Sequence, residues 1–282
     1  MTTQQLPVIL TIEGAAASNE DVVGDNVEVV NAMYQALLNA EEIAPDALRS
    51  YFVDFYLTQM LEGGFAQYVF MTPDRDELDN YIREGLEGMS AKEHLALFER
   101  TIEHYDSLSE TDMEAYLEGE SDEESGPSDA VATMEALDGE FEELLESEDV
   151  TGLNAVWLRS QPGLLVLDEQ ELQAHIATRV AGIPNLAQRQ AEAEEAELED
   201  APDFELIIRE LCAEAGHELE KITMGDPNFE HNGETVLAWH FRTDQGEFIM
   251  LEGDAEAVMI HPETKEVLAT VEFELEEDFV DA

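Results

Sequence analysis

The sequence predicts an α+β protein, with an N-terminal all-α helical domain followed by a small C-terminal domain of one helix on an antiparallel β-sheet. Up to about residue 186, apolar residues recur three and four positions apart, which is the spacing of helices with one buried face. From Val236 onward, short runs of alternating polar and apolar residues are separated by turn residues. At 282 residues, the chain is long enough for two hydrophobic cores.

The change of pattern divides the chain into four parts. We expect a leader arm over 1–24, an acidic all-helical domain over 25–186, an acidic linker or solvated helix over 187–202, and a small α+β domain over 203–282. Within the leader, residues 7–12 fit either an edge strand or an extended arm. Asp25 or Asn26 is expected to cap the first helix of the domain. In the last part we expect one helix and a sheet of three or four strands.

The most apolar and aromatic stretch runs from Tyr51 to Met71, in a helix that Pro45-Asp46 is expected to open. Its apolar residues keep helical spacing until Gly63 and Gly64 interrupt them. Glycine adopts left-handed backbone angles at little cost, so this pair predicts a sharp corner. An apolar face restarts at Phe65. The pattern predicts two helices that meet at a glycine corner and bury their faces against each other.

This corner, Glu62-Gly63-Gly64-Phe65-Ala66-Gln67-Tyr68, resembles the NGGFxQ(Y/F) corner of the DMP-type DNA-mimic family. Residues 128–167 are similar to the second half of that family, so the resemblance covers roughly 26–167. The chain departs from the family pattern at Leu61-Glu62, where an asparagine pair is usual. The resemblance implies an acidic helical fold and, from the founding type, occupation of the DNA-binding face of a transcription factor. The structural motif carried over consists of Gly63, Gly64, Phe65, Gln67 and Tyr68.

The unusual quantity is charge: 68 acidic residues against 12 basic ones give a formal net charge of -56. Nucleic acids and anionic membranes are excluded as direct partners, because binding them requires lysine and arginine. The helix that begins near Val131 places its apolar residues on one face and carboxylates on the other. Carboxylates three or four positions apart lie about 5–6 Å from each other. The candidate partner-binding face consists of Glu114, Glu118, Glu135, Asp138, Glu142, Glu143 and Glu146.

Two interpretations of this charge stay open. The first is an acidic protein-interaction module, a DNA mimic whose partner is a basic protein, either DNA-binding or related to transcription; a homodimer also stays open. The second is adaptation to high salt, with an uncharacterised function that includes enzymatic ones. Three lysines against nine arginines fit the second interpretation. The clustering of the charges, and an excess of glutamate over aspartate of roughly two to one, fit it less well.

Motifs for chemistry are not found, and we expect no catalytic, cofactor-binding or metal site. The chain has no GxSxG, Walker or GxGxxG sequence. Four histidines, His217, His231, His240 and His261, lack the spacing of a zinc site. His231 also stands where a calcium loop requires glycine. Cys212 fits a small core residue. Because the N-terminus lacks a basic region and no apolar run reaches about 18 residues, we expect a cytoplasmic protein.

Overall fold

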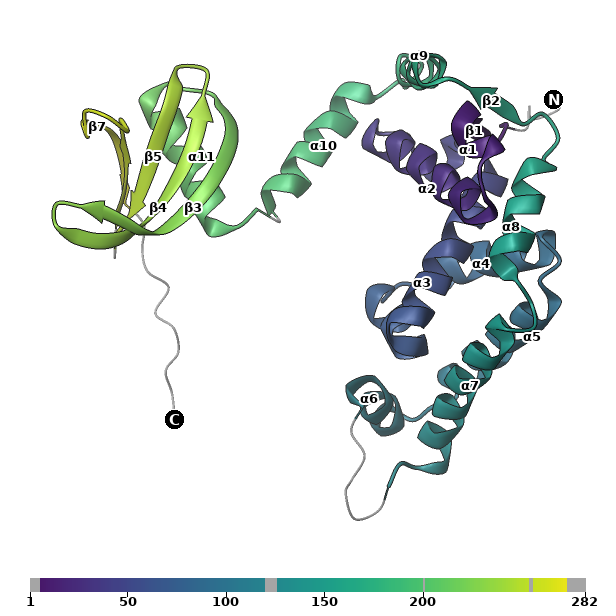
Figure 1. Cartoon of the computed structure of the whole chain (residues 1–282). Helices are drawn as coiled ribbons and strands as arrows, with labels where there is room; N and C mark the ends of the chain where they lie inside the picture. Colours follow the sequence, from purple (N-terminus) through teal and green to yellow (C-terminus); the bar gives the residue numbers. More distant parts are fainter. Residues whose placement is uncertain (1–5, 120–125, 200, 254–255, 273–282) are drawn as a thin grey trace. The chain divides into compact units, whose positions relative to one another are not determined.

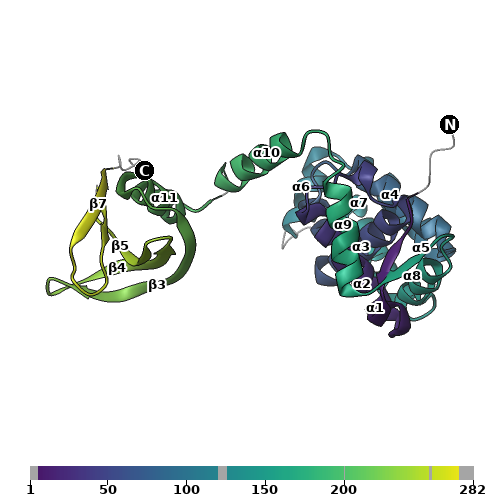
Figure 2. The ribbon, with the colours of Figure 1, turned by 90° about the horizontal axis from the view of Figure 1, so that it is seen from above.

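A computed structural model describes residues 6–119, 126–199, 201–253 and 256–272. The chain forms two compact units, Met1–Leu186 and Ala187–Ala282 (Figures 1 and 2). The described part of the first unit is mostly helical, and the second contains a five-stranded antiparallel sheet. The predicted α+β class is therefore confirmed. Each unit is described by itself below.

The first unit begins with a short strand that the sequence left undecided. Strand β1 (Ile9–Thr11) pairs in parallel with β2 (Leu165–Leu167), with Ile9 opposite Leu165 and Thr11 opposite Leu167. Leu10 is completely buried in a hydrophobic cluster that β1 shares with α2 and α8. The expectation of a purely helical first domain is thus corrected by one pair of three-residue strands.

Residues 6–24, expected as a leader arm, are part of the fold. Helix α1 (Ile12–Ala16) follows β1 directly, and α2 (Asn19–Gln35) begins well before the predicted cap. The Ser18 hydroxyl accepts from the backbone N–H of Asp21 at 3.2 Å and is the N-cap of α2. The prediction of Asp25 or Asn26 as the cap is therefore wrong. Both residues lie inside the helix and are buried.

One 3-10 helix and seven more α-helices complete the described helical part of the first unit. Their bounds are η1 (Ala40–Glu42), α3 (Pro45–Met71), α4 (Asp76–Gly88), α5 (Lys92–Asp106), α6 (Glu110–Glu118), α7 (Asp129–Leu145), α8 (Val150–Arg159) and α9 (Glu169–Val180), where η1 is a single 3-10 turn. Helix α3 begins with Pro45, as predicted, because proline is well accommodated in the first helical turn.

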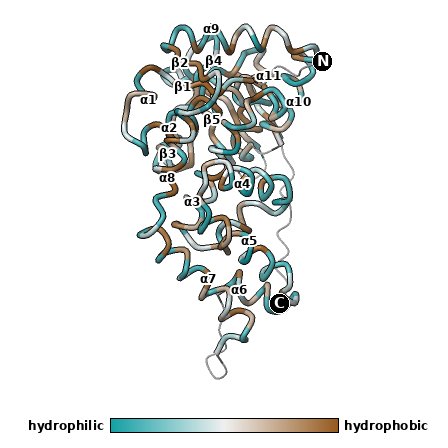
Figure 3. Tube along the Cα trace, turned by 90° about the vertical axis from the view of Figure 1, so that its right-hand side faces the viewer, coloured by the Kyte–Doolittle hydropathy of each residue, from teal (hydrophilic) through white to brown (hydrophobic). Residues whose placement is uncertain are grey.

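Two hydrophobic clusters hold the first unit together. One surrounds the glycine corner and draws on α3, α4, α5, α6 and α7, with Tyr56, Phe65, Tyr68, Phe98 and Phe141 among its largest buried side chains. The other joins β1, α2, the start of α3 and α8. In Figure 3 the trace of α7 alternates between hydrophobic and hydrophilic colours, as expected of a helix with one buried face. Helix α3 runs through both clusters and connects them.

In the second unit, α11 (Asp203–Ala215) packs on one face of the sheet. The strands are β3 (Leu219–His231), β4 (Glu234–Thr243), β5 (Gly246–Glu252), β6 (Glu256–Ile260) and β7 (Val267–Glu272), in that order across the sheet. Ile208, Leu211 and Cys212 of α11 meet Phe241, Met250 and Met259 of the sheet. Five strands correct the three or four predicted, because β3 was missed. Of the segment 187–202, left open between linker and helix, residues 187–199 are helical and belong to α10 (Leu186–Glu199).

Candidate protein-interaction surface

The glycine corner is present and its geometry requires glycine. Inside α3, Gly63 has φ −166° and Gly64 has φ 68° with ψ −164°, so the helix breaks into two parts there. A Cβ built on Gly64 would lie 3.0 Å from the carboxylate of Asp138 on α7. Because of the left-handed φ and this close approach, any larger residue at position 64 would be strained. The corner thereby brings the second part of α3 against α7.

Asp138 stabilises the corner through hydrogen bonds to its carboxylate. Its Oδ1 accepts from the backbone N–H of Phe65 at 2.9 Å, and its Oδ2 accepts from the Tyr116 hydroxyl at 2.8 Å. The side chain is therefore turned inward, and the prediction that Asp138 belongs to the exposed acidic face is corrected. The physical reason is that the N–H of Phe65, freed from the helix by the corner, needs an acceptor. One carboxylate thus connects α3, α6 and α7.

The environment of Asp138 acts on its protonation. Burial raises the pKa of the Asp138 carboxyl, and the nearby carboxylates Glu142 and Glu135 raise it further, against the hydrogen bonds from Phe65 and Tyr116 that lower it. The pKa of the Tyr116 hydroxyl is also raised, by burial and by the charge of Asp138. Tyr116 consequently stays a hydrogen-bond donor to Asp138 throughout the neutral range.

Asp79 of α4 is a buried carboxylate that binds the part of α3 after the corner. Tyr68 donates from its hydroxyl to Asp79 Oδ1 at 2.6 Å, and Arg75 forms an ion pair with the same carboxylate. Arg75 also pairs with Asp106 and lies over the ring of Tyr105, 5.4 Å from its centroid. Of the remaining motif residues, Phe65 is fully buried, and Gln67 donates to the side chain of Gln59 at 3.3 Å. The motif residues thus serve the internal packing and hydrogen bonding of the first unit.

The other six predicted face residues are exposed: Glu114 and Glu118 on α6, and Glu135, Glu142, Glu143 and Glu146 on and just after α7. Within the described part of the chain, none of the six side chains has an ion pair or a side-chain hydrogen bond to another group. Successive helical residues are rotated by about 100°, which places Glu135, Glu142 and Glu146 in one strip roughly 40° wide beside Asp138. We call these three residues the α7 strip. Glu143 lies about 60° further round the helix.

The charge density of this helix surface is close to that of one DNA strand. From Glu135 to Glu146 the helix rises about 16 Å at 1.5 Å per residue, and the α7 strip together with Glu143 supplies four carboxylates over that length. This is about one charge per 4 Å, compared with about one per 3.4 Å along a single strand of a duplex. Helix α6 adds Glu114 and Glu118, four residues apart and so about 6 Å along the axis.

Within the described residues, no cation forms an ion pair with the α7 strip. Arg100 on α5, which reaches α7, pairs with Glu140 at 2.5 Å. Helix α6 is held beside α7 by the bond from Tyr116 to Asp138 and by the Ser128 hydroxyl, which donates to Asp112 at 2.6 Å. The exposed carboxylates therefore stand on two helices whose relative position is fixed by side-chain contacts.

The other chemical candidates do not converge. Among the described residues, no group of three or more His, Cys, Asp or Glu side chains has the arrangement of a metal site. His217 and His261 pack against Phe248, and His240 packs against Phe229. Around His231, where the sequence was compared with a calcium loop, the chain forms the end of β3 and a two-residue turn at Asn232-Gly233. Cys212 is buried, and burial raises the pKa of its thiol to about 11.

The corner lies in a segment of the chain that is similar to a known family. Residues 41–161 match the model of the family described as DMP19-like protein. This confirms, over those residues, the resemblance to the DMP-type DNA-mimic family. No curated protein and no solved structure matches the chain. The matched segment contains the corner and all seven predicted face residues, whereas α1, α2 and α9 lie outside it. Within the described residues, no helix is long and apolar enough to span a membrane.

Proposed function

We propose that this protein is an acidic interaction module that acts as a DNA mimic, occupying the basic face of a DNA-binding protein. The observation that carries the proposal is the α7 strip, whose spacing of charge approaches that of a DNA strand and whose carboxylates have no cation of their own within the described residues. The match of residues 41–161 to the DMP19-like family supports it. A partner's arginines and lysines would meet carboxylates where they otherwise meet phosphates.

Fixed position is what distinguishes such a surface from a solvated charge run. Asp138 holds α3, α6 and α7 together from within, so the strip beside it stands on a supported helix. Association that depends on such charges is fast, because the electric field of the surface attracts an oppositely charged partner. It weakens as salt is added, because exposed charges are screened beyond about 10 Å at 0.1 M salt. Exposed Phe70, on the short helix after the corner, offers an apolar contact of the kind that interfaces favour.

The test uses the full chain as bait for basic DNA-binding proteins at low salt, with duplex DNA as competitor. In the test variant, Glu135, Glu142 and Glu146 are each replaced by glutamine. In the matched control, Glu194, Glu195 and Glu197 of the exposed helix α10 are replaced instead, so both variants lose three charges. We expect duplex DNA to displace the captured protein and the α7 variant to retain at least about tenfold less of it than the control.

Two results would contradict the proposal: equal loss in both variants, or a captured protein that duplex DNA does not displace. The high-salt interpretation is separated by unfolding the chain over a range of salt concentrations. A protein adapted to high salt should unfold when salt is removed, because unscreened repulsion among its carboxylates then outweighs the packing of its cores. We expect this protein to remain folded at low salt.

A further inference from the structure

A groove of about 1000 Å³ lies in the first unit between α1, α2 and α9. Figures 1 and 2 show α9 beside α2 and the β1–β2 pair. Asp25 sets one wall: its carboxylate accepts from the backbone N–H of Thr11 at 2.7 Å and from the Thr11 hydroxyl at 2.5 Å. Gly14 lies against this carboxylate so closely that a Cβ there would be 2.1 Å from it. This wall of the groove is therefore held in place by hydrogen bonds and close packing.

The lining of the groove has one sign of charge. Seven of its eighteen residues are aspartate or glutamate, and none of these described lining residues is lysine, arginine or histidine. Asp21, Asp25 and Asp168 bond to groups of the chain itself. Glu13, Glu20 and Glu28 have no ion pair or side-chain hydrogen bond within the described residues. Arg159 lies nearby, but its guanidinium donates to the backbone oxygens of Ala15, Ala17 and Ser18.

The floor of the groove is apolar and incompletely covered. Ile12 is 53% exposed, and Leu167, Leu172 and Ile176 are half-buried. Leu172 and Ile176 are four residues apart on α9, so they form a stripe on one side of that helix. Helix α9 has no fully buried residue along its twelve positions. An apolar floor between walls of carboxylates is complementary to a surface with apolar residues in the middle and cations at the sides.

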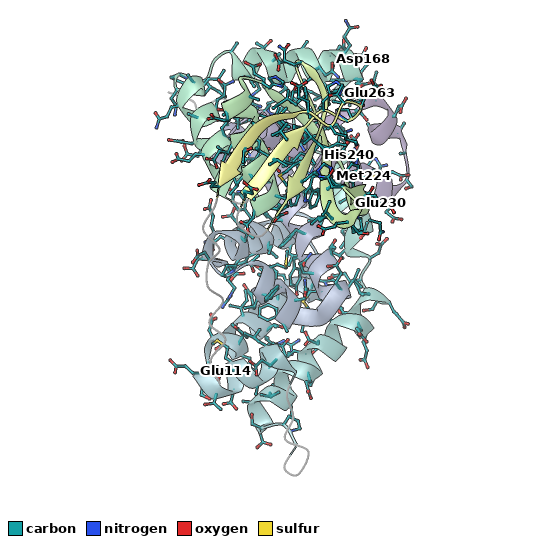
Figure 4. All side chains as sticks on the ribbon, turned by 90° about the vertical axis from the view of Figure 1, so that its left-hand side faces the viewer. Glu114, Asp168, Met224, Glu230, His240 and Glu263 are labelled. Atoms are coloured by element: carbon teal, nitrogen blue, oxygen red, sulfur yellow. The ribbon has the colours of Figure 1, made fainter. Side chains whose placement is uncertain are left out.

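We propose that this groove binds a basic amphipathic helix of a partner protein, with its apolar side on Ile12, Leu172 and Ile176 and its lysines or arginines against Glu13, Glu20 and Glu28. A helix about 11 Å wide with a pitch of 5.4 Å occupies roughly 500 Å³ per turn, so the groove accommodates about two turns. The site goes beyond the proposed DNA mimicry and does not depend on it. It lies outside residues 41–161, and Figure 4 shows Asp168, a groove residue, far from Glu114 of α6 within this unit.

The probe is a fluorescently labelled peptide of lysine and leucine, about four helical turns long, with its leucines on one face. A second peptide of the same composition has its leucines spread around the helix. Binding to the full chain is measured by fluorescence anisotropy at low and at physiological salt. The first variant replaces Glu20 and Glu28 by glutamine, and its control replaces Glu194 and Glu195 of the exposed helix α10. The second variant is Ile12→Ser, and its control is Val166→Ser, which changes a residue of β2 that is 44% exposed and outside the groove lining.

We expect the Glu20 and Glu28 changes to weaken binding of the amphipathic peptide about 5- to 30-fold, and Ile12→Ser to weaken it about 3- to 10-fold. Each control should change binding by less than about twofold. The spread-leucine peptide should bind more weakly and lose its binding as salt rises. Equal binding of the two peptides, or equal effects of the variants and their controls, would overturn the proposal, because either result indicates attraction to charge alone. The peptide measurement is independent of the partner-capture experiment with the α7 strip variant, so either proposal can fail without the other.

Discussion

The glycine corner and the α1–α2–α9 groove place the same side-chain type in opposite situations. At the corner, Asp138 and Asp79 are turned into the protein and are bound by donors that the chain supplies. In the groove, Glu13, Glu20 and Glu28 line open space without such donors among the described residues. A net charge of -56 does not distinguish these situations. The difference lies in which carboxylates meet an N–H, O–H or guanidinium group within the fold.

The largest expected effect is on the buried ion pair. Arg75→Met leaves Asp79, which is 5% exposed, without its cation, and should lower the free energy of unfolding by about 3–5 kcal/mol. The control is Arg100→Met, because Arg100 and Glu140 form a more exposed pair at 2.5 Å. That change should cost less than about 1 kcal/mol. Urea denaturation of both variants measures the difference, and equal losses would show that the corner carboxylates are not special.

Asp138 gives the next largest effect. Asp138→Ala removes the acceptor for the Phe65 N–H and the Tyr116 hydroxyl and should lower the free energy of unfolding by about 1–3 kcal/mol. Glu142→Ala, one turn along the same helix at an exposed position, should change it by less than about 0.5 kcal/mol. Thermal or urea unfolding separates the two. If Glu142→Ala were as damaging, the contrast between inward and outward carboxylates would be lost.

Two glycines beside this carboxylate form a third test. Gly64→Ala imposes a left-handed φ on alanine and brings its Cβ to 3.0 Å from Asp138, so it should lower the free energy of unfolding by about 1–2 kcal/mol. Gly139→Ala, within α7 and with nothing within 4 Å of the new Cβ, should instead raise it by about 0.5–1 kcal/mol. Opposite signs in denaturant melts confirm that the corner, and not the helix, needs glycine.

The smallest effect is the pH dependence of Asp138. Burial raises the pKa of its carboxyl in the folded protein. As pH rises from the unfolded value of about 3.9, the unfolded chain loses this proton while the folded chain keeps it, so the free energy of unfolding falls until the folded pKa is passed. Asp138→Asn lacks this titration. Comparing both proteins over that range should show the wild type losing stability relative to the variant. A relative gain would mean that the folded pKa is lowered.

The corner could be predicted from the sequence, because two consecutive glycines that interrupt an apolar helical pattern indicate a break in the helix. It misplaced Asp138 because this residue lies at the edge of the apolar stripe of α7, where helical spacing alone does not decide between inside and outside. The deciding group, the N–H of Phe65, is 73 residues away in the chain. Strand β3 was missed because three register irregularities and mostly exposed positions remove the alternation that identifies a strand.

The groove gave no signal in the sequence. Its walls come from residues 11–32 and 167–176, which are distant in the chain, and residues 11–24 of the first wall were expected to be a leader arm. Ser18 was available as a cap for α2, and reading it as one would have moved the start of that helix to Asn19. The parallel pairing of β1 with β2 could not be inferred, because three-residue strands carry no periodic pattern.

By itself, the sequence determined the α+β class, the position of the corner and the sign of the surface charge, because local spacing, glycine and composition fix these without reference to distant residues. The tertiary structure alone decided which carboxylates are bonded inside and which remain open to a partner's cations. That assignment depends on donors brought from other elements, such as Phe65 and Tyr116 for Asp138, and on the fold that makes α2 and α9 line one groove. Contacts between segments that are distant in the chain cannot be predicted from the local sequence of either segment.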